Sequence, residues 1–294
     1  MEELDKKTRD IKSDRSSGAS QLARKALGVL RFFVQTNKNQ TSTDFKNDFT
    51  ELGRTLFESR PNMASVQNLV AQTVYEVNTM EEHDLAAVRK FAASRIDELH
   101  RQSEDDVKKS AEYAATVIAD SGVLATCSYS STVCEALKVA KQQGKSFKVF
   151  VAESRSGDNR FRYGQTLANF LKTANVNAEV FPDDQIGRYV QRANRVLVGA
   201  DSLLFDGSVI NGSPTYELAT EAKECGIPFY AVCETTKANA LSGLGRNFEV
   251  KEGFDRVPPQ LITGIITENG IIGTDEVAEL MKEKVKFLEV FQLG

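Results

Sequence analysis

After about Glu112 the sequence alternates short apolar runs with longer amphipathic segments, and this alternation restricts the fold more than any other feature. The apolar runs cover residues 122–126, 147–153, 178–181, 195–201, 228–232 and 263–267. Helices are predicted between them at 135–142, 167–173, 184–193 and 216–225, with a hairpin at 202–211 and a terminal helix. Strands that alternate with helices of this length form a mostly parallel sheet covered on both faces. The fold class is therefore α/β.

The part before this alternation is predicted to be helical. Apolar residues recur at spacings of three and four in Leu22, Ala26, Val29, Leu30 and Phe33, and again in Val66, Leu69, Val70 and Val74. Charged residues dominate from Met80 to Lys109, which favours a long solvated helix leading into the next domain. We expect an N-terminal helical domain of residues 1–112, followed by a Rossmann-like α/β domain of residues 113–294.

Composition indicates an ordinary globular protein, because hydrophobic residues make up 41% and charged residues 27% of the chain. The formal net charge of −4 gives no overall attraction to nucleic acid or to anionic membranes. No apolar run reaches the length of a signal peptide or a spanning helix. We expect a cytoplasmic protein that binds neither nucleic acid nor membrane directly.

Cysteine and histidine usage excludes several kinds of site. The cysteines lack the paired C-x-x-C spacing of zinc sites and are expected to be free thiols: Cys127, Cys134, Cys225 and Cys233. Both histidines, His83 and His100, fall in a charged helical stretch and are expected at the surface. No G-x-G-x-x-G, P-loop or metal motif occurs, so we expect no metal and no cofactor.

Two reactive side chains follow predicted strands. Cys127 follows GVLAT and precedes a helix start, where free amides and the helix dipole are expected to lower a thiol pKa. Asp201 ends the run RVLVGAD, and poor solvation there is expected to raise its carboxyl pKa. The alternatives are a buried core cysteine and an aspartate that caps a turn.

Further polar residues have anion-binding character. Arg15 precedes Gly18 at the start of a predicted helix, and Arg60 precedes Pro61, which is expected at another helix start. Glu153 and Arg155 end the second apolar run, at the sheet edge that also carries Cys127 and Asp201. Ligands of parallel sheets bind at this edge. The alternatives are solvated arginines, a simple helix cap and a local salt bridge.

Several strings together resemble one known family: LATCSYSS, AESR, VLVGADSLLFDGSVIN and FDRVPPQLITGIITENGII. This family contains the archaeal ribose-1,5-bisphosphate isomerases, the methylthioribose-1-phosphate isomerases and the regulatory subunits of eukaryotic initiation factor 2B. The match covers nearly all of the predicted α/β part and extends into the helical part through SGAS, SRPN and Asn68. The compact length is nearer to the ribose-1,5-bisphosphate isomerases and to the alpha subunit of the factor.

The resemblance implies that Cys127 and Asp201 are the catalytic pair, because the isomerases carry a Cys and an Asp at these positions and the regulatory subunits generally do not. It also implies a substrate pocket formed by Arg15, Gly18, Ala19, Arg60, Ser128, Glu153, Arg155, Asn211 and Lys237. The implied partners are a phosphorylated pentose and further copies of the chain, as a homodimer or a hexamer built as a trimer of dimers. A nucleotide effector is left open.

The sequence departs from the family pattern at two places. Thr126, Cys127 and Ser128 stand where the family usually has His-Cys-Asn, and Gly212 stands where it usually has a lysine near the substrate. Either Lys237, Arg155, Arg160 or Arg162 replaces that cation, or the substrate differs.

The resemblance implies an aldose-1-phosphate to ketose-1-phosphate isomerase with a Cys/Asp acid–base pair. The first expectation is conversion of ribose 1,5-bisphosphate to ribulose 1,5-bisphosphate. A non-catalytic regulatory subunit that binds a sugar or nucleotide phosphate is the competing hypothesis. An isomerase of methylthioribose 1-phosphate or deoxyribose 1-phosphate is the third.

Overall fold

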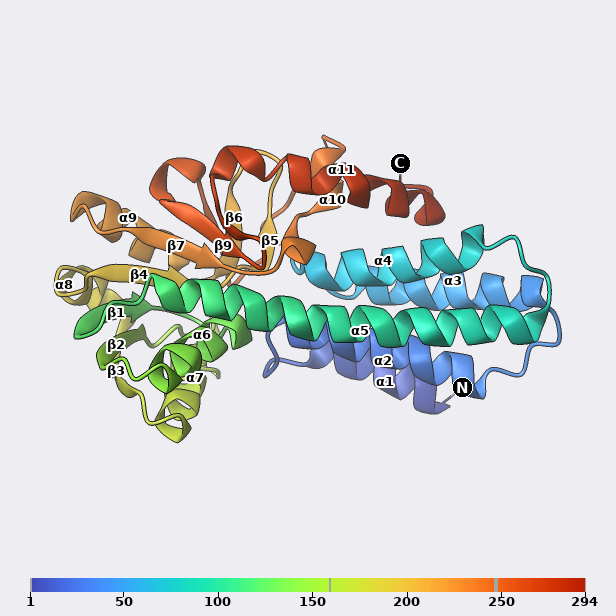
Figure 1. Cartoon of the computed structure of the whole chain (residues 1–294), viewed down its shortest axis with the longest axis horizontal. Helices are drawn as coiled ribbons and strands as arrows, with labels where there is room; N and C mark the ends of the chain where they lie inside the picture. Colours follow the sequence, from blue (N-terminus) through green and yellow to red (C-terminus); the bar gives the residue numbers. More distant parts are fainter. Residues whose placement is uncertain (1, 159, 246–247, 294) are drawn as a thin grey trace.

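A computed structural model describes residues 2–158, 160–245 and 248–293. Its N-terminal part is helical, as predicted, with the bounds α1 Glu2–Ser13, α2 Ala19–Thr36, α3 Ser42–Glu58, α4 Ala64–Thr79 and α5 Leu85–Thr116. Figure 1 shows α5 running from the helical part to the sheet, so one continuous helix passes through residue 112. A division of the chain near residue 112 stays a proposal.

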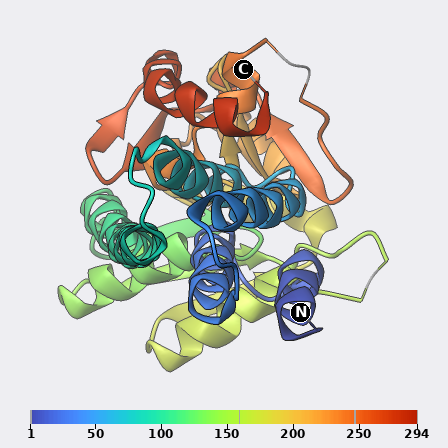
Figure 2. The same ribbon diagram turned by 90° about the vertical axis from the view of Figure 1, so that its right-hand side faces the viewer.

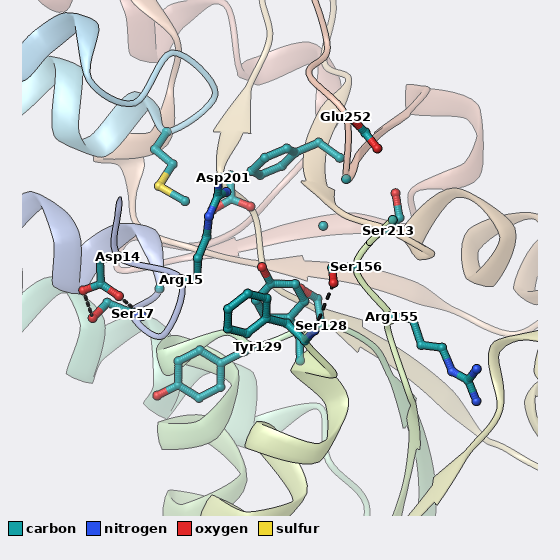
Figure 3. A pocket seen from close by; sticks show the side chains of 18 of the residues that line it. Asp14, Arg15, Ser17, Ser128, Tyr129, Arg155, Ser156, Asp201, Ser213 and Glu252 are labelled. Carbon is teal, nitrogen blue, oxygen red and sulfur yellow. Dashed lines mark hydrogen bonds between the residues drawn. The ribbon is translucent and has the colours of Figure 1, made fainter. Parts of the chain in front are cut away.

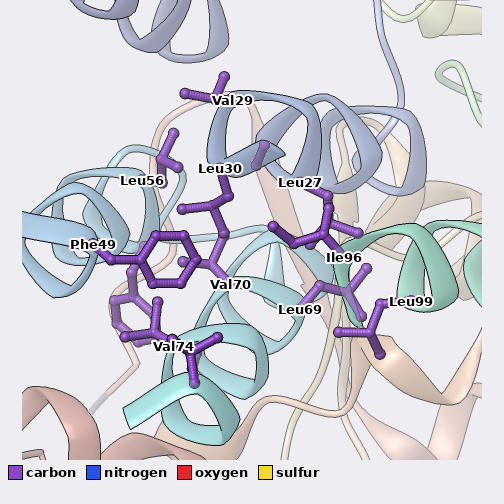
Figure 4. Packing of buried hydrophobic residues seen from close by; sticks show 14 of the residues in the cluster. Leu27, Val29, Leu30, Phe49, Leu56, Leu69, Val70, Val74, Ile96 and Leu99 are labelled. Carbon is purple, nitrogen blue, oxygen red and sulfur yellow. The ribbon is translucent and has the colours of Figure 1, made fainter. Parts of the chain in front are cut away.

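The helical part has its own core, and Figure 2 looks along its helices. The residues predicted from the three-and-four spacing are all buried there, including Leu22, Leu30 and Val70. Figure 4 shows Leu27, Leu30, Phe49, Leu69 and Ile96 meeting from different helices. Helix α1 is absent from the sequence-based prediction because its residues are mostly charged and only Ile11 is buried.

The α/β part contains, within the described residues, a seven-stranded sheet of order β10-β9-β7-β4-β1-β2-β3. Its strands are β1 Gly122–Thr126, β2 Phe147–Ala152, β3 Asn177–Phe181, β4 Arg195–Val198, β7 Phe229–Val232, β9 Gly264–Thr267 and β10 Gly270–Ile272. All pairings are parallel except that of β10 with β9. The predicted α/β fold with a mostly parallel sheet is therefore confirmed.

Helices cover both faces of this sheet. The end of α5 lies on one face with α6 Ser131–Gln142 and α7 Tyr163–Thr173. The other face packs against α8 Ile186–Val190 and α9 Thr215–Glu224. Burial from both sides explains why the central strands are almost continuously apolar.

The chain after β4 contains a strand, β8, that the sequence did not predict. The predicted hairpin forms β5 Ser202–Leu203 and β6 Val209–Gly212, but β6 also pairs with β8 Phe254–Val257, giving a small antiparallel sheet. Strand β8 lacks a clear apolar run because Asp255 and Arg256 occupy its centre.

The predicted terminal helix is broken into short pieces. Single turns and short helices follow one another: η4 Thr274–Glu276, η5 Glu279–Met281, α11 Lys282–Val285 and η6 Lys286–Phe291. The short helix α10 Ala240–Gly243 lies earlier in the chain, between β7 and β8. The last piece, η6, returns to the helical part, where the Phe291 ring lies 5.1 Å from that of Phe57. No helix among the described residues has the length and apolarity needed to cross a membrane.

Helix α5 begins at a side-chain cap, and removing that cap should weaken the fold. The Asp84 carboxylate accepts a hydrogen bond of 2.8 Å from the Ala87 amide. We expect Asp84→Ala to lower the free energy of unfolding by about 1 kcal/mol, because an orphaned amide of the first turn loses its acceptor. Urea denaturation measures this loss. Glu81→Ala, an exposed neighbour before the helix, is the control and should change stability by less than about 0.5 kcal/mol.

Candidate functional site

A pocket of about 300 Å³ opens beside the carboxyl ends of the central strands. Strand β1 pairs with β2 on one side and β4 on the other, so the strand order reverses here. Open parallel sheets bind ligands at such a switch. The described lining residues are Asp14, Arg15, Ser17, Gly18, Arg60, Met63, Ser128, Tyr129, Arg155, Ser156, Gly157, Asp158, Phe161, Tyr163, Asp201, Gly212, Ser213, Glu252, Gly253 and Phe254. This volume is at the lower end of the roughly 300–1,000 Å³ of small-molecule sites.

Helix N-termini surround the pocket. Gly18 caps α2, and a Cβ atom at Gly18 would lie 3.4 Å from Ser131 Oγ at the start of α6. Met63 is the N-cap of α4 and Tyr163 begins α7, and both line the same pocket. Amides and dipoles at helix N-termini favour anions, so this arrangement suits a phosphate group.

Arg60 shapes the loop in front of α2 rather than offering a free guanidinium. Its Nε donates to the Ile11 carbonyl at 2.9 Å, and its Nη2 donates to the Asp14 carbonyl. Burial lowers the Arg60 pKa, and the positive charge of Arg15 lowers it further. Pro61 lies in a turn before α4, which begins at Ala64, so the expectation of Pro61 at a helix start is wrong.

The same loop is fixed from its other side by Asp14. Its carboxylate accepts hydrogen bonds from Ser16, Ser17 and Lys25. Burial raises the Asp14 pKa, but these hydrogen bonds outweigh burial and hold the pKa well below its usual range. Within the described residues, the guanidinium of Arg15 has neither a hydrogen bond nor a salt bridge, so it is free to bind an anion.

Cys127 follows β1, as predicted, but its thiol is not activated in this structure. The side chain is 1% exposed, and burial raises its pKa to about 12. The expectation of a lowered pKa is therefore wrong. Burial is the main cause, and the contact of Sγ with Thr215 Oγ1 at 3.1 Å lowers the pKa without offsetting burial.

The hydrogen bonds around Thr215 identify the donor in that contact. The Thr215 hydroxyl donates its proton to the Gly212 carbonyl at 2.6 Å and accepts one from Asn211 Nδ2 at 2.9 Å. Its remaining lone pair can only accept, so Cys127 must donate. Cys127 is therefore held as a protonated thiol, the form that a general acid requires.

Asp201 follows β4 at the other side of the switch. Its backbone is fixed between β6 and α4, because its N–H donates to the Ile210 carbonyl and its carbonyl accepts from the Ala64 amide. Burial raises the carboxyl pKa to about 6, while Lys237 and Arg60 act in the opposite direction. The expected rise of this pKa is confirmed. A carboxyl with such a pKa can exchange protons near neutral pH.

Glu153 and Arg155 form a salt bridge, the alternative left open by the sequence. The buried Glu153 carboxylate binds Arg155 Nε at 2.5 Å and Arg162 Nη1 at 2.6 Å. In Figure 3 the Arg155 guanidinium points away from the centre of the pocket. Arg160 pairs with Asp158, and neither Arg160 nor Arg162 is among the described lining residues. None of these arginines is a free replacement for the missing lysine.

Gly212 packs directly against the side chain of Ser128. Ser128 has a left-handed backbone conformation with φ of 60°. A Cβ atom at Gly212 would lie 2.5 Å from Ser128 Oγ, which is too close for any real contact. The two departures from the family pattern are thus coupled, since a side chain at 212 would require Ser128 to move.

Lys237 is buried behind the pocket and held by Glu234. Their atoms Nζ and Oε2 are 3.8 Å apart, and both side chains are at most 4% exposed. Glu234 also accepts hydrogen bonds from Ser20 of α2 at 2.5 Å and from Thr132 of α6 at 2.6 Å. Asn68 donates to the carbonyls of Thr236 and Ala238, which fixes the turn η2 Thr235–Lys237. Glu234 therefore joins the helical part to the sheet edge.

The predicted site residues fall into two layers. Arg15, Gly18, Arg60, Ser128, Arg155 and Asp201 line the pocket. Five others are buried and are not among its described lining residues: Ala19, Cys127, Glu153, Asn211 and Lys237. Sequence reasoning missed Tyr129, Phe161, Tyr163, Ser213, Glu252 and Phe254. Tyr163 begins α7 and Phe254 begins β8, whereas the other four lie in connecting segments, and only the fold brings them together.

The remaining cysteines and the histidines behave as expected. All four thiols are free, and Cys225 is exposed whereas Cys134 and Cys233 are buried. His83 is exposed, and the half-exposed His100 lies 3.9 Å from Glu104. The described residues contain no group of three His, Cys, Asp or Glu side chains arranged for a metal ion.

The fold is Rossmann-like, with a pocket at the strand-order switch. A model of the initiation factor 2 subunit family matches residues 15–253, so the chain belongs to this family and the resemblance is confirmed.

Relatives carry two kinds of name. The eIF-2B subunit 2-like protein of Pyrococcus furiosus is 33% identical over 276 residues, covering 90% of this chain and 94% of that protein. The ribose 1,5-bisphosphate isomerase of the same organism is 26% identical over 300 residues, covering 93% and 91%. The structure of the Pyrococcus horikoshii OT3 translation initiation factor eIF-2B has a TM-score of 0.80 at 30% identity, covering 92% and 97%. The relatives therefore include sugar-phosphate isomerases and proteins named after the initiation factor.

Proposed function

We propose that this protein is an aldose-1-phosphate isomerase that converts a phosphorylated pentose into its ketose 1-phosphate, with Cys127 and Asp201 as the acid–base pair. The observation that carries the proposal is a titratable carboxyl and a protonated thiol on the two strands that flank one pocket. Helix N-termini and the free Arg15 supply a place for the phosphate. Ribose 1,5-bisphosphate is supported as substrate by the name of one relative.

The proposed reaction needs no oxidant or reductant. The Asp201 carboxylate removes the proton on C2, a C1–C2 double bond forms, and the bond from C1 to the ring oxygen breaks. The ring oxygen takes the Cys127 proton. The resulting enol loses its O2 proton to the Cys127 thiolate while C1 receives the proton held by Asp201, which gives the ketose 1-phosphate. Because Cys127 lies behind the lining, ligand binding must shift the start of α9 at Thr215 to expose the thiol.

A non-catalytic regulatory subunit is the second candidate, and two observations favour it. Cys127 is 1% exposed with its thiol already bound to Thr215, and the eIF-2B-like relative has the higher identity. Such a protein would bind a sugar or nucleotide phosphate without converting it.

We also propose a cytoplasmic homodimer or trimer of dimers, because relatives are named as subunits.

A turnover assay separates the two functions. Purified protein is incubated with ribose 1,5-bisphosphate, methylthioribose 1-phosphate and deoxyribose 1-phosphate, and ketose is measured for native protein, Cys127→Ser and Cys225→Ser. We expect conversion of at least one substrate, a loss of about 10²–10⁴-fold in Cys127→Ser, and normal activity in the exposed-cysteine control. Binding without conversion by native protein would favour the regulatory function.

A further inference from the structure

The two sides of the pocket differ in charge. Figure 3 shows Arg15 and Ser17 on one side, and Glu252 and Ser213 on the other. The Arg15 side also carries the start of α2 at Gly18, the buried Arg60, Asp201, and Asp14, whose carboxylate is paired with Lys25. This side offers positive charge and helix amides, so the single phosphate of an aldose 1-phosphate belongs there.

The opposite side presents carboxylates without matching cations. Glu252 lines the pocket, and its Oε1 would lie 2.7 Å from a Cβ atom at Gly157, so its carboxylate faces the loop after β2. Asp183 and Asp255 lie behind this side. Burial is the main cause of the raised Cys127 pKa, and the negative charges of these two residues raise it further. Among the residues that the structure describes, Glu252, Asp183 and Asp255 form no salt bridge.

The cations on this side are already bound. Arg155 and Arg162 both hold Glu153, and Arg160 pairs with Asp158. A second phosphate placed here would meet Glu252, and because the arginines on this side are already in salt bridges, they offset the repulsion between like charges only in part.

Aromatic rings lie on the same side of the pocket as Glu252. Phe161 is 44% exposed, lines the pocket and stacks on Tyr163 with ring centroids 6.2 Å apart. Phe254 follows Glu252 and also lines the pocket. Exposed rings beside a carboxylate suit an uncharged group that is apolar or donates hydrogen bonds.

We infer that the substrate carries one phosphate, at C1, that its C5 end is uncharged, and that Glu252 is the residue that disfavours a second phosphate. This inference rests on the proposed function and narrows its substrate class. The reason is geometric, because the only free cation among the described lining residues lies on the Arg15 side, whereas Glu252 and the rings lie opposite.

Calorimetric binding tests this assignment without requiring turnover. Methylthioribose 1-phosphate, whose C5 end is uncharged, and ribose 1,5-bisphosphate are titrated into native protein, Glu252→Gln and Glu249→Gln. We expect native protein to bind the monophosphate about tenfold more tightly. Glu252→Gln should tighten bisphosphate binding about three- to tenfold more than it tightens monophosphate binding. Glu249 pairs with Lys251 in the same loop and is not among the described lining residues, so its variant should bind as native protein does.

The outcomes separate this inference from the isomerase itself. Equal or tighter binding of the bisphosphate by native protein, an equal effect of Glu252→Gln on both ligands, or no binding of either would overturn the inference. Selective binding of the monophosphate without its conversion would support the inference and contradict the isomerase. Conversion of ribose 1,5-bisphosphate in preference to the monophosphate would support the isomerase and exclude the role of Glu252.

Discussion

Replacing Asp201 by asparagine is expected to remove isomerase activity and to make the protein more stable above pH 6. The amide keeps the shape of the carboxyl group but cannot take a proton from the substrate. General acid–base groups typically contribute 10²–10⁴-fold to a rate, so kcat should fall by about that factor. A steady-state assay beside urea denaturation at several pH values measures both effects.

The stability effect follows from the direction of the pKa shift. Burial raises the Asp201 pKa from 3.8 to about 6 in the folded protein. Folding therefore favours the neutral carboxyl. The contribution of Asp201 to the free energy of unfolding is fully present below pH 3.8. That contribution is lost as the pH rises to about 6, where the folded protein must hold a poorly solvated charge. Asp201→Asn never ionises, so its advantage should reach about 1–3 kcal/mol at pH 8 and vanish near pH 4.

Asp206→Asn is the matched control for this prediction. Burial raises the Asp206 pKa, but hydrogen bonds from Ser208 and Arg256 outweigh burial and lower it. Neutralising Asp206 should therefore destabilise the protein slightly at pH 8 instead of stabilising it. If Asp201→Asn gave the same stability change at pH 4 and pH 8, the carboxyl would not be ionising in a poorly solvated environment, and its proposed role as the base would lose its physical reason.

The fold was largely predictable because its determinants are local. Central strands buried on both faces must be largely apolar, so β1, β2, β4 and β7 appear as apolar runs in which Lys148 and Arg195 are the charged exceptions. The elements that were missed lack such a signal. Helix α1 buries only Ile11, and β8 is half polar because it lies at the edge of a small sheet. The terminal helix was predicted as one element after the last strand, but its turns are too short for a periodic pattern.

The candidate site was predictable only in part. The positions of Cys127 and Asp201 follow from the rule that parallel strands end at one edge of the sheet. The state of the thiol does not, because it depends on Thr215, which lies 88 residues further along the chain. Glu252 and Phe161 are equally invisible in the sequence, since neither belongs to a motif. The sequence therefore predicts where the site lies. It does not predict the chemistry of the site, because that chemistry depends on contacts between residues that are far apart in the chain.

Breaking the buried pair of Glu234 and Lys237 is expected to be the most destabilising change to the charges around the pocket. Glu234→Gln leaves the Lys237 ammonium in the interior without its partner, and Lys237→Met leaves the carboxylate without its counter-charge. Removing one member of a buried ion pair typically costs about 3–5 kcal/mol. We expect each single variant to lose stability in this range, as measured by urea denaturation.

The double variant Glu234→Gln/Lys237→Met should lose less than the sum of the single losses, with a coupling energy of about 1–3 kcal/mol, because no unpaired charge remains. Some loss should persist, since a glutamine side chain has one acceptor oxygen and cannot satisfy the hydroxyls of both Ser20 and Thr132. The exposed pair Glu279 and Lys282 is the control, because solvated pairs couple by less than about 1 kcal/mol. Strictly additive losses at Glu234 and Lys237 would mean that the two charges do not depend on each other. The connection between the helical part and the sheet edge would then rest on the Ser20 and Thr132 hydrogen bonds alone.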